Sequence, residues 1–150
     1  MEIILQPIAF VKNSRKDVTD DFWGTVFSEI ELAEPIPTEV FDNIESFSHL
    51  EILFYFDKVD KIVYSGRPRG NPDYPVVGIF AQRKKDRPNQ IGLTTVELLE
   101  HNERSIKVKG LDAIDGTPVV DIKPVFKEFT APDEVRQPEW VQDLMKDYWK

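Results

Sequence analysis

Eleven prolines are spread through this chain of 150 residues, and they divide it into segments too short for a fold built on long helices. Most of the segments between them are rich in Val, Ile, Phe and Thr, the residues that strands favour. Several segments also alternate apolar and polar residues, which indicates half-buried strands. We therefore expect mainly short strands, in the runs 3–11, 23–32, 49–56, 75–81, 92–100, 104–111 and 117–126.

Two of these runs, 49–56 and 75–81, are apolar almost throughout, and we expect each to form a strand that is buried on both faces. The runs 92–100 and 104–111 are separated by a short polar stretch. They predict a hairpin that turns around His101–Glu103.

Helix is scarce in the sequence. Residues 37–44 predict one short helix, with Thr38 as its cap. Residues 138–149 predict a second helix with Pro138 in its first turn. Its apolar residues share one helical face because they follow the spacing i, i+3, i+4, i+7: Val141, Leu144, Met145 and Tyr148.

These elements predict a single domain, residues 1–150, of mainly β class: a small barrel or sandwich of short strands with a C-terminal α-helix. The length suits one ordinary domain. Strands and helices do not alternate along the chain, and a Gly-rich dinucleotide fingerprint is missing. A Rossmann fold is therefore not expected.

The charge pattern limits the classes of partner. The net charge of −8 argues against a surface that wraps nucleic acid. Positive charge is nevertheless concentrated in residues 58–70 and 82–90, each of which has four basic residues against one acid, a balance of +3. These stretches predict either a local anion site or two solvated loops.

Other functional classes have little support. The chain has no cysteine, and its two histidines, His49 and His101, lack metal-ligand spacing. No signal peptide and no apolar run of membrane-spanning length are visible. We expect a cytoplasmic protein without a metal site and without a membrane segment.

The stretch Gln82–Gln90 has the residues of a recognition loop. Arg83 and Arg87 offer forked donors to a carboxylate or a phosphate. Asn89 can hydrogen-bond its own backbone or the edge of a base, and Gly92 permits a close backbone approach or a positive φ. We expect two buried strands to hold this loop rigid.

Three further groups have weaker signals. Asp112, Asp115 and Asp121 surround an Asp-Gly turn, and such carboxylates accept bonds from ribose hydroxyls or serve only the turn. His49 begins an apolar strand, where a structural role is the simpler interpretation. The "DDFWG" stretch places Phe22 and Trp23 either against a planar ring or in the core.

Three blocks of the sequence together resemble a known family. "GIFAQRKKDRPNQIGLT" is similar to the "FATR…RPNPIG" signature of the TsaA-like, TrmO-type proteins. "IESFSHLEILFYF" resembles the "L-E-x-F-S-H-L" strand of that family, and "LDAIDGTPVVDIKP" resembles its "D-x-x-D-G-T-P-V-x-D-I-K-P" segment. The blocks occur in the order that the family has.

The resemblance implies a small β-barrel, usually homodimeric, that uses S-adenosylmethionine to methylate N6 of threonylcarbamoyladenosine beside the tRNA anticodon. Carried over by position, it implies two sets of site residues. The cofactor set is Phe56, Asp57, Lys58, Arg83, Leu93, Leu111, Asp112, Ala113, Ile114 and Asp115. The substrate set is Asp21, Phe22, Trp23, Arg87 and Asn89.

Two positions depart from the family pattern. Gln90 stands where the family has proline, and "DDFWG" stands where the family has "PRQPG". The second change leaves the substrate open: tRNA, another RNA or a small molecule, or no turnover at all in a cofactor-binding module. No general base is evident; Asp57, Asp115 and His49 are the candidates. The apolar C-terminal helix is expected to cover the barrel or a partner subunit.

Overall fold

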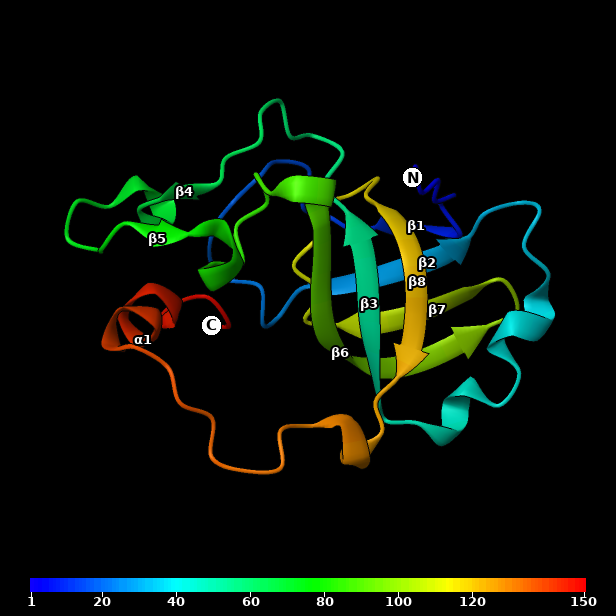
Figure 1. Cartoon of the computed structure of the whole chain (residues 1–150). Coiled ribbons are helices and arrows are strands. Elements are labelled where there is room, and N and C mark those ends of the chain that lie inside the picture. Colours follow the sequence, from blue (N-terminus) through cyan, green and yellow to red (C-terminus); the bar gives the residue numbers. More distant parts are fainter.

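Six of the strands close into an antiparallel barrel in the computed structural model, which describes residues 1–150 (Figure 1). Their order around the barrel is β1-β2-β7-β6-β3-β8, so the predicted fold class is confirmed. Closure leaves no barrel strand with an unpaired edge. The strands are β1 (Ala9–Lys12), β2 (Phe27–Leu32), β3 (His49–Tyr55), β6 (Ile91–Asn102), β7 (Ser105–Lys109) and β8 (Pro118–Pro124).

The barrel interior is filled by side chains that alternate along each strand. In β3, Leu50, Ile52 and Phe54 are buried, whereas His49 and Tyr55 are exposed. The expectation that this run is buried on both faces was wrong: one face of the strand lines the core and the other faces outward. The strand is apolar throughout, but barrel geometry buries only every second residue.

Strand β6 forms a corner of the barrel. Its first half pairs with β3, from Tyr55↔Ile91 to His49↔Glu97, and its second half pairs with β7. The register shifts by one residue between Leu98 and Glu100, which is a bulge that bends the strand. The predicted hairpin is confirmed, since Asn102 pairs with Ser105.

Opposite ends of the barrel have different covers. At one end, two 3₁₀ turns follow β2, η1 (Thr38–Phe41) and η2 (Ile44–Ser46), and Phe41 is buried there. The predicted helix at 37–44 is therefore a 3₁₀ turn, and the cap was wrong: Pro37 precedes η1, with no side-chain cap bond. At the other end the loop between β7 and β8 inserts Leu111 and Ala113 into the core.

The run 75–81, predicted to be a second buried strand, does not enter the barrel. It forms the two-residue strand β5 (Val77–Gly78), which pairs with β4 (Ser65–Gly66), and the 3₁₀ turn η4 (Ile79–Ala81). Only Ile79 of its apolar side chains is buried, while Phe80 is 84% exposed. We call residues 62–82 the arm; it also contains η3 (Pro68–Gly70) and projects beside the barrel (Figure 1).

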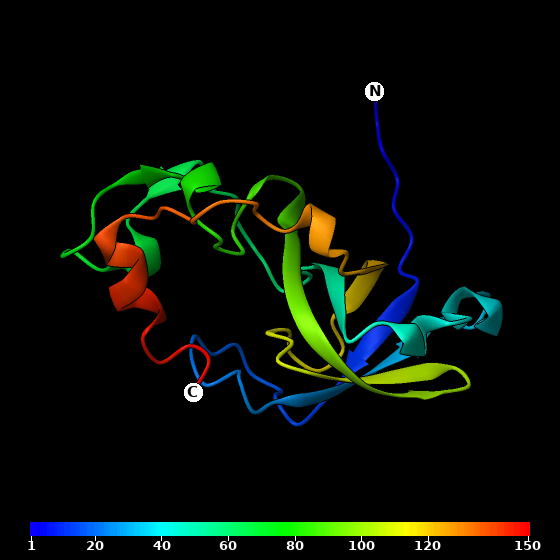
Figure 2. The ribbon, with the colours of Figure 1, turned by 90° about the horizontal axis from the view of Figure 1, so that it is seen from below.

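The C-terminal part crosses from the barrel to the arm. After β8 and η6 (Lys127–Phe129), residues 131–137 run extended to α1 (Glu139–Met145), which lies beside the arm in both ribbon views (Figures 1 and 2). Pro138 directly precedes α1, and Tyr148 lies beyond its end. No helix has the length and apolar character that a bilayer span requires.

Candidate functional site

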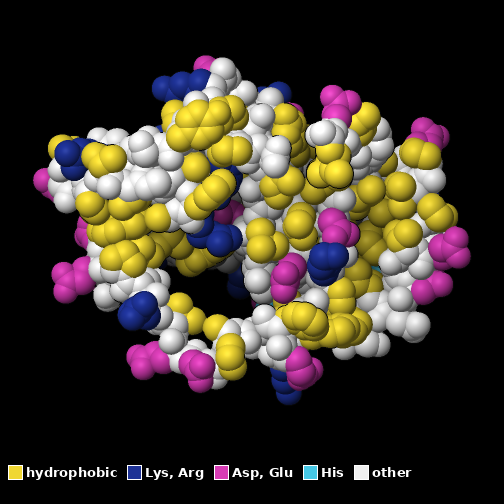
Figure 3. All heavy atoms as spheres, in the orientation of Figure 1, with side chains coloured by type: hydrophobic (Ala, Val, Ile, Leu, Met, Phe, Trp, Pro, Cys, Tyr) yellow, Lys and Arg dark blue, Asp and Glu magenta, His cyan; other side chains and the backbone are white.

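Three long connections meet at one end of the barrel, which we call the site end. They join β1 to β2, β3 to β6 through the arm, and β7 to β8. All three leave and re-enter the barrel at this end because neighbouring strands are antiparallel. The space-filling view shows an opening between the barrel, α1 and the 131–137 segment, with Lys and Arg side chains on part of its rim (Figure 3).

Asp112 is held from two sides at this end. Thr94, on β6, donates its hydroxyl to one carboxylate oxygen, and Tyr148 donates its hydroxyl to the other. Burial and the neighbouring Asp112 carboxylate raise the pKa of Tyr148, so this hydroxyl stays protonated and remains a donor. The carboxylate keeps free lone pairs on both oxygens and can accept further bonds.

The neighbours of Asp112 face in other directions. Leu111 and Ala113 are buried in the barrel core, so only their backbone is available to a ligand. Asp115 accepts bonds from the backbone N–H of Asn13, at 3.0 Å, and from Lys16 Nζ, at 2.6 Å. These contacts hold the pKa of Asp115 below its ordinary value, and they direct its carboxylate towards the β1–β2 connection.

The charged side chains of Gln82–Gln90, the central loop, mostly form hydrogen bonds and ion pairs with other groups of the protein. Arg83 donates to the backbone carbonyl of Leu93, and Arg87 Nη1 donates to that of Gln82, at 2.7 Å. Burial raises the pKa of Asp86, but Lys85 and Lys84 outweigh burial and lower it overall. The loop is thus held by its own side chains, not by two buried strands as expected.

The end of the central loop is joined to the end of β3. Asn89 and Gln90 both have positive φ, 62° and 51°. The Gln90 side chain donates to the carbonyl of Phe56, at 3.0 Å, and its backbone carbonyl accepts from the Phe56 N–H, at 2.8 Å. A Cβ on Gly92 would lie 2.5 Å from the ring of Phe54, which confirms the close approach predicted there.

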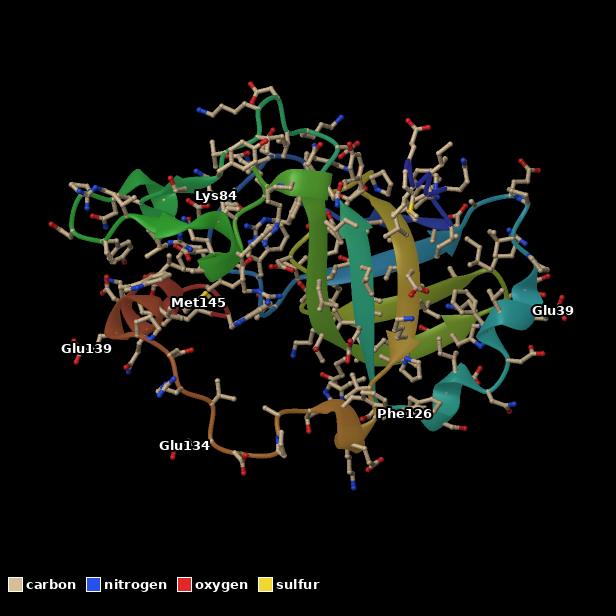
Figure 4. The ribbon with its side chains drawn as sticks, viewed as in Figure 1. Glu39, Lys84, Phe126, Glu134, Glu139 and Met145 are labelled. Carbon is tan, nitrogen blue, oxygen red and sulfur yellow. The ribbon has the colours of Figure 1, made fainter.

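Phe56, Asp57 and Lys58, the third part of the predicted cofactor set, follow β3 at the site end. The ring of Phe56 packs edge-on against Phe54, with centroids 5.2 Å apart. The carboxylate of Asp57 lies 4.0 Å from Lys58 Nζ, and both side chains reach solvent. Figure 4 shows Lys84 and Met145 on this side of the molecule and Glu39 on the far side.

The three predicted substrate residues of the "DDFWG" stretch differ in exposure and in contacts. Trp23 is only 2% exposed, with the guanidinium of Arg15 4.2 Å from its ring centroid, so of the two placements expected for this ring the structure has the one in the protein interior, and the ring is not available to a substrate. Phe22 is 58% exposed and remains available. Asp21 receives two bonds from Arg69, at 2.9 and 3.4 Å, and is thereby fixed against the arm.

The charges around Tyr148 show which groups come together. Asp112, Arg69 and Arg83 all act electrostatically on its hydroxyl. Arg69 also forms an ion pair with Asp21, so Asp21 lies nearby. Carboxylates and guanidiniums therefore share this corner, so charges of both signs are present there. Such a site suits a zwitterionic ligand better than a simple anion.

Several predicted groups lie elsewhere. His49 begins β3, so it lies at the opposite end of the barrel, about 20 Å from the site end at 3.3 Å per residue. His101 is also there, where it contacts Glu45 and Phe41. Asp121 faces outward beside Lys123, at 2.8 Å. No three His, Asp or Glu side chains are arranged to hold a metal ion.

A pocket of about 380 Å³ on the outside of the barrel contains none of the predicted site residues. Its lining comes from four strands: Lys12, Phe27, Ser28, Glu29, Glu100, Asn102 and Lys107. Sequence reasoning missed the roles of Thr94, Arg69 and Tyr148. Arg69 belongs to a basic stretch, but nothing in the sequence pairs Tyr148 with Asp112.

The fold and the site together define a small antiparallel barrel with a loop-built site at one end that contains charges of both signs. Residues 20–131 match the model of the tRNA-methyltransferase O N-terminal domain, and the chain belongs to this family. The family resemblance of the three sequence blocks is thus confirmed. The matched residues contain all the predicted site residues and leave α1 and Tyr148 outside.

Individual relatives agree with this membership. The chain is 36% identical over 129 residues to an S-adenosyl-L-methionine-binding protein of Archaeoglobus fulgidus, covering 84% of this chain and 91% of that protein. It is 46% identical over 90 residues to the tRNA (adenine(37)-N6)-methyltransferase of Escherichia coli, covering 54% of this chain and 37% of that enzyme.

A crystal structure of TrmO from Pseudomonas aeruginosa superposes with a TM-score of 0.75 at 26% identity, covering 91% of this chain and 61% of that chain. The chain thus spans 37% of the Escherichia coli enzyme and 61% of the Pseudomonas aeruginosa chain, both under two thirds, and nearly all of the shorter archaeal protein.

Proposed function

We propose that this protein is an S-adenosylmethionine-dependent methyltransferase that methylates N6 of a modified adenosine, threonylcarbamoyladenosine, beside the tRNA anticodon. One observation carries the proposal: Arg83, Leu93 and Asp112, which are distant in sequence, converge at the site end of a barrel from this family. The family's named tRNA methyltransferases and S-adenosylmethionine-binding proteins support both the reaction and the cofactor.

The donor set at the site fits such a cofactor. Its amino-acid end carries an ammonium and a carboxylate, for which Asp112 supplies acceptors and Arg83 supplies free donors. Leu93 is 42% exposed and Phe56 is partly exposed, so apolar surface is available for the adenine ring. The backbone of residues 111–115 supplies further donors and acceptors. Asp57 and Lys58 would border the pocket.

When bound, S-adenosylmethionine supplies a methyl group that its sulfonium already activates. The protein residues then have one main task, which is to hold the acceptor nitrogen in line with that methyl carbon and to exclude water. Internal bonds make the central loop suitable for this task, because Arg83 and Arg87 are anchored to backbone carbonyls.

A proton must leave the acceptor nitrogen, and the three candidate bases differ in their suitability. His49 lies at the opposite barrel end. Asp115 has a lowered pKa because Lys16 bonds to it, which makes it a weak base. Asp57 remains the best placed of the three, since it follows β3 at the site end and reaches solvent.

Substrate recognition would use the exposed parts of the same end. Phe22 presents an exposed ring for stacking on a base. Asn89 occupies a left-handed turn position, and Arg87 donates to the carbonyl of Gln82 in the same loop. Lys84 and Lys85 keep about a third of their side-chain surface exposed and can reach phosphates.

Two alternatives rest on specific observations. The net charge of −8 and the acidic Asp20–Asp21 pair favour a substrate other than tRNA, such as another RNA or a small molecule. A cofactor-binding module without turnover is the second, because relatives that the chain covers almost fully are named for binding alone.

The deciding experiment combines binding and turnover. Calorimetry with S-adenosylmethionine should show binding, which Arg83→Ala weakens about tenfold or more because a charge-assisted contact is lost. Arg136→Ala is the control, since Arg136 is exposed on the 131–137 segment and makes no bond. Nucleoside mass spectrometry of tRNA treated with the protein and S-adenosylmethionine should show methylated threonylcarbamoyladenosine. Binding without any methylated nucleoside would contradict the enzyme proposal.

We further propose a cytoplasmic, single-domain homodimer. The arm exposes apolar side chains that a partner subunit would cover: Tyr64 at 76%, Val76 at 60% and Phe80 at 84%. Light scattering at micromolar concentration distinguishes a dimer from a monomer. Phe80→Asp should shift a dimer towards monomer, and a monomeric wild-type protein would contradict this part.

A further inference from the structure

The segment from residue 131 to residue 137 is a free tether. All its residues are exposed, and no hydrogen bond or ion pair joins them to the rest of the protein. Figure 4 shows Glu134 on this segment, between Phe126 and Glu139, with no other element beside it. The residues beyond the tether, Glu139–Lys150, are therefore held by their own contacts; we call them the C-terminal segment.

The C-terminal segment docks on two sites. Its helix α1 lies on the arm, where the hydroxyl of Tyr74 donates to Asp143 Oδ2, at 2.5 Å, and the ring of Tyr74 lies 6.1 Å from that of Trp140. Its last residues lie along "DDFWG": the Trp23 N–H donates to the carbonyl of Tyr148, at 2.8 Å. Docking there requires Gly24, because a Cβ would lie 1.8 Å from the carbonyl oxygen of Trp149.

This docking places one side chain in the candidate site. Tyr148 is fixed by the Trp23 backbone on one side, and its hydroxyl contacts Asp112 on the other. Thr94 contacts the second oxygen of the same carboxylate. Two hydroxyls, from β6 and from the C-terminal segment, together set the plane of the Asp112 carboxylate.

We propose that Tyr148 is a positioning residue that holds the Asp112 carboxylate in the orientation that receives the cofactor, and that the C-terminal segment is the strap that delivers it. The inference rests on the proposed function, because it takes Asp112 as a cofactor contact. It goes beyond the family match, which ends at residue 131 and does not include Tyr148.

The physical reason is preorganisation. A carboxylate that hydroxyls hold at both oxygens meets a cationic ligand without reorienting, whereas a free one must lose rotational freedom on binding. Removing a hydrogen bond to a charged group therefore weakens ligand binding by about tenfold. Thr94 and Tyr148 act on the same carboxylate, so loss of either hydroxyl should have a similar effect.

Full-length Tyr148→Phe tests the inference by calorimetry with S-adenosylmethionine. We expect the Kd to rise about tenfold relative to wild type. The control variant Tyr64→Phe, whose exposed hydroxyl makes no bond, should stay within about twofold. Hydrogen exchange at the Trp23 amide shows whether the strap stays docked, since that amide bonds to the backbone of Tyr148.

Thr94→Val is the second test, because it removes the other hydroxyl without touching the strap. A raised Kd in both Thr94→Val and Tyr148→Phe supports positioning, even if the strap loosens in the latter. Wild-type affinity in Tyr148→Phe with a protected Trp23 amide overturns the inference and leaves the proposed function intact. Wild-type affinity in Thr94→Val also overturns it. Failure of the wild-type protein to bind S-adenosylmethionine overturns both.

Discussion

The barrel and the arm are built on different physical principles. Each barrel strand pairs with neighbours on both sides, and fourteen apolar residues fill the interior. The arm has two strands of two residues each, and α1, which lies on it, has no buried residue. The comparison teaches that apolar packing holds the barrel, while another kind of contact must hold the arm.

Polar side chains hold the arm by bonding to its backbone. Gln82 is 8% exposed, and its amide donates to the carbonyls of Gly66, at 3.0 Å, and Val77, at 3.1 Å. Arg67 donates to the carbonyl of Tyr74, at 2.5 Å. Such contacts position backbone without a large core, which suits a region that borders a ligand site but gives it less stability than the barrel has.

The largest expected difference concerns aromatic residues. Phe54→Ala removes a buried barrel ring that packs on Gly92 and Phe56, and should lower the free energy of unfolding by about 3–5 kcal/mol. Phe80→Ala in the arm removes a ring that is 84% exposed in a single subunit, so it should change the free energy of unfolding of the monomer by less than about 0.5 kcal/mol. Urea unfolding, measured at a protein concentration below that at which any dimer forms, compares the two variants. Similar losses of unfolding free energy in both variants would contradict the difference proposed between the barrel and the arm.

A smaller and local effect is expected from the polar anchor of the arm. Gln82→Ala leaves two carbonyls without their donor and should weaken the arm by about 1–3 kcal/mol, with little change in the barrel. Hydrogen exchange should speed up at the Ile79 amide, which bonds to Tyr64 in the arm, and remain slow at barrel amides. Gln137→Ala, in the tether, serves as the control. Faster exchange throughout the barrel would mean that the two regions unfold as one unit.

The smallest effect depends on pH and concerns a loop of the barrel itself. Lys16 lowers the pKa of Asp115 in the folded protein, so their contact stabilises the fold above the ordinary carboxyl pKa of about 4. This contribution is lost as the pH falls through the lower folded pKa. Asp115→Asn should therefore show a weaker fall in Tm than wild type between neutral and acidic pH, while Asp133→Asn behaves as wild type. Parallel profiles for all three proteins would show that the contact adds no pH-dependent stability.

The residue pattern was sufficient to predict a barrel or sandwich of short strands with its hairpin, and the family blocks implied the barrel. The run 92–100 and the run 104–111 alternate in a way that only a strand permits, and local alternation survives in any fold that buries one face. The three family blocks also indicated which loops to expect at the candidate site. The run 75–81 misled because its apolar residues resemble a core strand, although most are exposed on the arm.

Sequence alone thus determined the strands, the barrel class and the identity of Arg83 and Asp112 as site candidates, because periodicity and motif are local properties. Only the tertiary structure decided that Tyr148 meets Asp112, that Arg69 fixes Asp21, and that Trp23 is buried. Those contacts join residues separated by tens of positions. Their formation depends on how barrel closure brings the chain connections together at one end, and no short segment encodes that.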